Sequence, residues 1–204
     1  AFHPKLHLRL GVDGARLIVG SANATAAGWG SNHEIVTALD WKRKSDDAGD
    51  VVLAPLIRRA YDYLASWLDA VPGGALDFKM RLHWRDSPWL ADIEPNTQAI
   101  DLPDGSAIDI FFERGGDPAG MLPRLLTLAA GETPLRMIVV SPYWDTQLDG
   151  LRELQRGLNR CATVIALNPA LNEFPESPLD PEAPTTFAAI RDSDDGRRFL
   201  HAKI

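Results

Sequence analysis

A histidine and a lysine stand two residues apart at both ends of this chain. His3 and Lys5 come at the start, and His201 and Lys203 come at the end. A neutral imidazole can attack phosphorus and a charged one can donate a proton, while a lysine ammonium suits phosphate oxygens. Residues two apart on a strand point to the same face. We therefore expect the two ends to be two halves of one phosphate-handling site.

The first of these pairs lies in a predicted hairpin. From Lys5 to Leu10, polar residues alternate with leucines, which predicts a strand with one face on a core. Residues 12–15 are typical of a turn. A second strand over residues 16–19 would then deliver residues 20–23 beside the first strand.

The residues that follow this hairpin are small and polar. Gly20 allows close backbone approach, and Ser21 and Asn23 offer a hydroxyl and an amide as short hydrogen-bond donors. A His-x-Lys, then Gly-Ser-x-Asn, then a distant second His-x-Lys resembles the phospholipase D superfamily. The likeness is strongest to bacterial phospholipase-D-like domains of restriction, repair and helicase-linked proteins.

This resemblance implies cleavage of phosphodiesters without a metal ion or another cofactor. One histidine would attack phosphorus and form a phosphohistidine, and the other would protonate the leaving oxygen and then activate water. Carried over by motif, His3 is the nucleophile and His201 the acid. Glu34 matches an acidic residue that follows Gly-Ser-x-Asn and orients a catalytic histidine. The phosphate would be held by Lys5, Lys203, Gly20, Ser21 and Asn23.

The chain departs from the superfamily pattern in two ways. Leu10 stands where the motif has an aspartate, and Asp13 lies in the predicted turn. The second motif has no Gly-Ser-x-Asn of its own within the sequence. We therefore expect an internal segment of a longer protein with flanking domains. A surface hairpin with an incidental histidine at each end is the simpler alternative.

The pattern of hydrophobic residues predicts an α/β protein with mixed sheets flanked by helices, built from two pseudo-symmetric repeats. Residues 1–74 would be the second half of the first repeat, with an amphipathic helix over 50–70. Residues 75–118 would be a connector with a hairpin over 98–112. Residues 119–204 would be the first half of the second repeat.

The second repeat is expected to contain a strand–helix–strand unit. Helix 119–130 precedes an apolar strand over 135–140, a helix over 146–159 and a second apolar strand over 163–167, an order typical of a parallel pair. A loop over 168–184 follows, because five prolines lie there.

Tyr143 and Trp144 follow the strand 135–140. Ligands in open α/β sheets bind at the carboxyl ends of strands, so both residues are candidates for lining the substrate cleft. The alternative is that Trp144 packs in the core and Asp145 caps the next helix.

Two further stretches combine aromatic and basic residues, at 41–44 and at 79–89. Such residues can stack on bases and hold phosphates, but they also occur as ordinary packing with solvated cations.

The charge balance restricts how the chain would bind nucleic acid. Its net charge is −7, with 28 acidic and 21 basic residues, which argues against a broad basic face but allows a local positive cleft. The single Cys161 excludes an internal disulfide and a cysteine-based zinc site. No apolar stretch is long enough to span a membrane.

We therefore expect a cytoplasmic nuclease, with nucleic acid as substrate, no stable membrane association and no metal. Two alternatives stay open. One is hydrolysis or transfer of a phospholipid headgroup, and the other is a catalytically inactive nucleic-acid-binding module.

Overall fold

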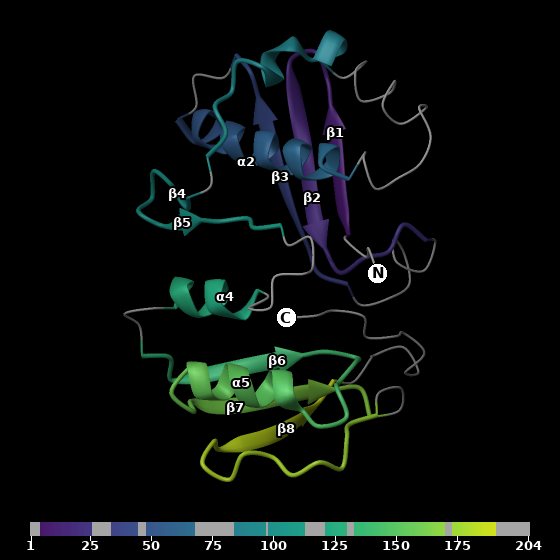
Figure 1. The fold of residues 1–204 in the computed structure, drawn as a ribbon, viewed down its shortest axis with the longest axis vertical. Coiled ribbons are helices and arrows are strands. Elements are labelled where there is room, and N and C mark those ends of the chain that lie inside the picture. The colour runs from purple at the N-terminus through teal and green to yellow at the C-terminus, as the bar shows by residue number, and fades with distance from the viewer. Residues whose placement is uncertain are drawn as a thin grey trace. The chain divides into compact units, whose positions relative to one another are not determined.

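The computed structural model describes residues 5–25, 34–44, 48–67, 84–96, 98–112, 121–129, 133–169 and 173–190. These residues form small sheets and helices, which confirms the expected mixed α/β class (Figure 1). The chain divides into two compact units. Unit 1 comprises Ala1–Val19 and Thr37–Phe112, and unit 2 comprises Gly20–Val36 and Glu113–Ile204.

A three-stranded sheet forms one layer of unit 1. Its strands are β1 (Leu6–Leu10), β2 (Gly14–Gly20) and β3 (Val36–Lys42), in that order. β1 and β2 are antiparallel, with Leu6 opposite Val19. The predicted hairpin is therefore confirmed, and β3 completes the sheet beside β2.

Helix α2 (Ala48–Ala65) forms the second layer and lies across one face of this sheet (Figure 1). The helix was predicted from the spacing of its apolar residues. The leucines of β1 pack toward the core, as their alternation predicted. The buried core consists of Ala15, Leu17, Trp41, Ile57, Ala60, Tyr61, Trp89 and Leu90.

The predicted connector contains a short 3-10 helix, η2 (Pro88–Leu90), and a small hairpin of β4 (Ile100–Asp101) and β5 (Ala107–Ile108). The strands pair antiparallel over two residues each and are shorter than predicted. Ser106 closes the turn by donating its backbone N–H to the Asp104 carboxylate at 2.9 Å.

Unit 2 contains a parallel three-stranded sheet and two helices among its described residues. Its elements are α4 (Leu122–Leu128), β6 (Arg136–Val140), α5 (Asp149–Gly157), β7 (Ala162–Leu167) and β8 (Thr185–Ala189). β6 pairs parallel with β7, and β7 pairs parallel with β8. The predicted strand–helix–strand unit is confirmed, whereas β8 was not predicted.

A buried glutamine links α5 to β7 and β8 by hydrogen bonds. Gln155 of α5 is fully buried, and its amide nitrogen donates to the hydroxyls of Thr163 on β7 and Thr185 on β8, at 3.2 and 3.1 Å. Leu148, Leu151 and Ile165 form the buried apolar core beneath α5.

The proline-rich segment before β8 is fixed to this unit over residues 173–184. The Arg152 guanidinium donates to the carbonyl of Pro178, and the Ser177 hydroxyl donates to the carbonyl of Thr146 at 2.7 Å. Arg160 lies 3.1 Å from the Glu182 carboxylate. Within the described part of the chain, no helix is long and apolar enough to cross a membrane.

Candidate functional site

The predicted site residues fall into two groups. The first group lies outside the described residues and consists of His3, His201 and Lys203. The structure describes Lys5, Gly20, Ser21, Asn23, Glu34, Tyr143 and Trp144.

Lys5 and Gly20 bracket the hairpin in sequence. Lys5 directly precedes β1 and is half-buried, and Gly20 is the last residue of β2, the strand that pairs with β1. Gly20 lies against the chain that leads into β3. A Cβ atom placed on it would clash with the Ile35 carbonyl oxygen and lie 2.8 Å from the Val36 Cα. A side chain here would therefore push the two strands apart.

Ser21 is held by hydrogen bonds to Glu34 and Ile35, the two residues that precede β3. It is only 7% exposed. Its backbone N–H donates to the Ile35 carbonyl at 2.9 Å, and its Oγ accepts from the Ile35 N–H at 3.0 Å. Its hydroxyl proton points to the Glu34 carboxylate, with an Oγ–Oε2 distance of 2.5 Å. Hydrogen bonds from a hydroxyl to a carboxylate are the short, strong kind.

This contact brings together two predicted site residues that stand thirteen positions apart. The resemblance predicted that Ser21 would hold phosphate and Glu34 would orient a histidine. In the structure, the Ser21 hydroxyl donates to Glu34 at 2.5 Å, with the Ile35 carbonyl as a longer second acceptor at 3.4 Å, and both predicted roles stay predictions. Asn23 lies just beyond, half-buried, where its carbonyl accepts from the Thr25 N–H at 2.8 Å and forms a tight turn.

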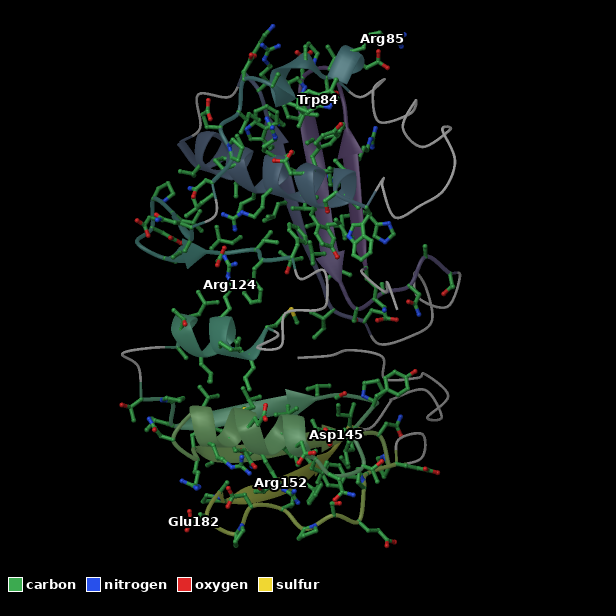
Figure 2. The ribbon with its side chains drawn as sticks, viewed as in Figure 1. Trp84, Arg85, Arg124, Asp145, Arg152 and Glu182 are labelled. Atoms are coloured by element: carbon green, nitrogen blue, oxygen red, sulfur yellow. The ribbon has the colours of Figure 1, made fainter. Side chains whose placement is uncertain are left out.

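Trp144 packs as the alternative reading expected. Its ring meets Phe174 edge-on, with centroids 5.0 Å apart, and it contacts the apolar core beneath α5. Asp145 lies at the start of α5 (Figure 2). Its carboxylate accepts the N–H of Asp149 at 2.7 Å and the N–H of Gly150 at 3.3 Å, and these bonds lower the pKa of Asp145. Tyr143 is 62% exposed.

A pocket of about 540 Å³ opens beside Trp144. Its lining includes Phe174, Glu173 and Glu176, and none of the described residues that line it is basic. Carboxylates repel a phosphate, so this pocket is chemically unsuited to hold one. Trp144 could contribute an aromatic face to a base, but its surroundings do not favour the phosphate backbone.

The aromatic residues of the two mixed stretches are mostly core residues. Trp41 is buried with its ring 4.4 Å from that of Trp89. Trp84 meets Tyr61 edge-on at 5.2 Å, under the guanidinium of Arg58. These contacts favour packing over base stacking for the three tryptophans. Figure 2 labels Trp84 in the upper part of unit 1 in that view. Lys79, Arg81 and His83 lie outside the described residues.

Cys161 is a buried free thiol. In the ranges that the structure describes, no group of three or more His, Cys, Asp or Glu side chains is arranged to hold a metal ion. The expectation of metal-independent chemistry stays a prediction.

The chain matches no protein-family model, and neither curated proteins nor solved structures give a significant match.

Proposed function

We propose that this chain is part of a metal-independent phosphodiesterase of the phospholipase D type that cleaves nucleic acid. The observation that carries the proposal is the contact between Ser21 and Glu34. The resemblance assigns a serine and an acidic residue to one site, and the buried Ser21 hydroxyl donates to the Glu34 carboxylate. Ser21 directly follows β2, and β2 pairs with β1, the strand that Lys5 precedes.

The proposed reaction proceeds in two steps through a covalent intermediate. The His3 imidazole attacks phosphorus, the bond to the leaving oxygen breaks, and His201 donates a proton to that oxygen. His201 then takes a proton from water, the water oxygen attacks phosphorus, and the bond to His3 breaks. The two histidines need opposite protonation states at one pH. Lys5, Lys203 and Asn23 would stabilise the equatorial oxygens.

The proposal includes a fold assignment. A phospholipase D fold has two pseudo-symmetric repeats, and the β6–α5–β7 unit of parallel strands is consistent with the opening of one repeat. Tyr143 follows β6 and is exposed, so we assign it to the lining of the substrate cleft on the basis of the resemblance.

The test is an assay of the purified protein on DNA, RNA and phosphatidylcholine in excess chelator. Cleavage of a nucleic acid should persist in EDTA, whereas loss with EDTA would contradict the mechanism. His3→Ala and His201→Ala should each abolish turnover. His7→Ala is the matched control, because His7 lies on β1 and has no assigned role.

The covalent intermediate provides an independent readout. Quenching in alkaline detergent during turnover of a ³²P-labelled substrate should leave a phosphohistidine on wild type, stable in alkali and lost in acid, and none on His3→Ala. Label on His201 instead would reverse the two roles. Turnover in both histidine variants equal to that of His7→Ala would refute the proposal.

A specific observation favours a second candidate, a catalytically inactive nucleic-acid-binding module. Leu10 replaces the motif aspartate, and its side chain packs against the core of unit 1. It therefore cannot supply a carboxylate to the site. This candidate predicts nucleic-acid binding without cleavage, and unchanged affinity in both histidine variants.

A further inference from the structure

The face of the β1–β2–β3 sheet opposite its core carries a cluster of cations. Alternation along the strands sends Leu8, Leu17 and Trp41 into the core of unit 1. The neighbouring residues on the same strands therefore point the other way. These are Arg9 on β1, Arg16 on β2, and Asp40 and Lys42 on β3, all exposed.

The four charged residues surround a groove of about 630 Å³. Gly11 and Gly14 also line it. A Cβ atom on Gly14 would lie 2.5 Å from the Trp41 carbonyl oxygen, so the close approach of β2 and β3 excludes any side chain there. The two glycines carry no side chains, so a flat or extended ligand can approach the backbone closely at these positions.

The charges around the groove do not cancel. The strand register places Arg9 directly opposite Arg16, and like charges opposite each other destabilise a sheet. Asp40 offsets Arg16 with a forked pair, at 2.5 Å to Nε and 2.8 Å to Nη2. This contact raises the pKa of Arg16 and lowers the pKa of Asp40.

Arg9 and Lys42 have no ion pair among the described residues. Three cations thus face one carboxylate, in a chain whose net charge is −7. An acidic protein can still attract a polyanion where its cations are concentrated. Guanidinium and ammonium groups are the usual partners of phosphate oxygens.

We propose that this groove binds the phosphate backbone of a nucleic acid strand, with Arg9 and Lys42 as the two phosphate contacts. The choice of nucleic acid rests on the proposed function. Among the described residues that line the groove, Trp41 is the one aromatic residue; it is just 6% exposed, and its ring is turned into the core against Trp89. Base stacking is therefore absent there, and binding through this groove is independent of base sequence.

The experiment is a titration of the full protein with a fluorescein-labelled oligonucleotide, followed by anisotropy at several salt concentrations. Gel analysis after each titration checks that the oligonucleotide is intact. Each phosphate contact contributes about 0.7–0.9 to the slope of log K against log salt. Arg9→Gln with Lys42→Gln should therefore lower the slope by about 1.4–1.8 and weaken binding about tenfold or more at low salt.

The matched control is Arg85→Gln with Arg124→Gln, which removes the same charge from exposed residues that are not among those lining the groove. For this control, the slope of log K against log salt should stay close to the wild-type slope. An oligonucleotide of the same sequence with a neutral methylphosphonate backbone should bind weakly, and the groove variant should not change that binding.

Three results would overturn the proposal: equal slopes for the groove variant and the control, an effect of the groove variant that persists on the neutral backbone, or a strong preference for one base sequence that the groove variant abolishes. These outcomes are separate from those of the cleavage assay. A protein that binds through the groove without cleaving would retain this inference and refute the nuclease.

Discussion

Arg59 of α2 holds the small hairpin of unit 1 against the helix. Its guanidinium lies 2.6 Å from the Asp109 carboxylate, and both side chains are largely buried, with exposures of 12% and 6%. It also donates to the carbonyls of Asn96, Gln98 and Ile110 at 2.6–2.7 Å. One side chain therefore satisfies a carboxylate and three backbone acceptors around β4 and β5.

Replacing Arg59 with methionine keeps the aliphatic stem and removes the charge. Removing one partner from a buried ion pair costs about 3–5 kcal/mol, because the other charge stays buried without compensation. We take about 3 kcal/mol, since the three released carbonyls can reach water near the surface. With a urea dependence of about 2 kcal/mol per molar, the midpoint of unfolding should fall by about 1.5 M.

The assay is urea unfolding followed by tryptophan fluorescence, because Trp41, Trp84 and Trp89 all lie in unit 1. Asp109→Asn should also be strongly destabilising, and the double variant should lose much less than the sum of the two. Arg85→Gln is the control, because its pair with Asp86 is exposed and should leave the midpoint unchanged. A midpoint for Arg59→Met equal to that of Arg85→Gln would refute the reasoning.

Three further predictions concern the candidate site and its frame. Asp145→Asn should lower the free energy of unfolding at pH 7, because backbone hydrogen bonds stabilise the charged carboxylate and lower the pKa of Asp145 from 3.8. The difference from wild type should disappear as the pH falls through that lowered pKa. Acid-unfolding curves followed by circular dichroism measure it. Gly20→Ala should cost about 1–3 kcal/mol in urea unfolding, because the added methyl would lie 2.8 Å from the Val36 Cα, and should speed hydrogen exchange at the Ser21 amide. Glu34→Gln should lower kcat and shift one limb of the pH–rate profile, if the carboxylate orients a histidine; an unchanged profile would leave it only a brace for Ser21.

Much of the local structure followed from periodicity in the sequence. The leucine alternation of β1 and the helical stripe of α2 are long and regular, and both predictions were correct. β8 was missed because Thr185–Ala189 contains a single large apolar residue and follows a proline-rich segment. It pairs parallel with β7 and receives one hydrogen bond from Gln155, partners that no local pattern in residues 185–189 encodes.

The aromatic and basic residues at 41–44 show where composition alone was insufficient. In the sequence, they form one stretch. Strand β3 continues through Lys42, so strict alternation sends Trp41 into the core and Lys42 to the opposite face. What alternation cannot supply is the partner on the next strand, which places Arg9 opposite Arg16.

The contact between Ser21 and Glu34 is the part of the site that most constrains its chemistry. The resemblance assigned Ser21 and Glu34 to one site without predicting a contact between them, whereas the structure places Ser21 Oγ 2.5 Å from Glu34 Oε2. A carboxylate beside a phosphate-binding turn is repulsive unless a proton or a cation stands between the two charges. The proposed histidine supplies that proton, which is why a nuclease would need Glu34 here. Without such a histidine, the same carboxylate would keep phosphates away, and the pair would serve only to fix the turn after β2.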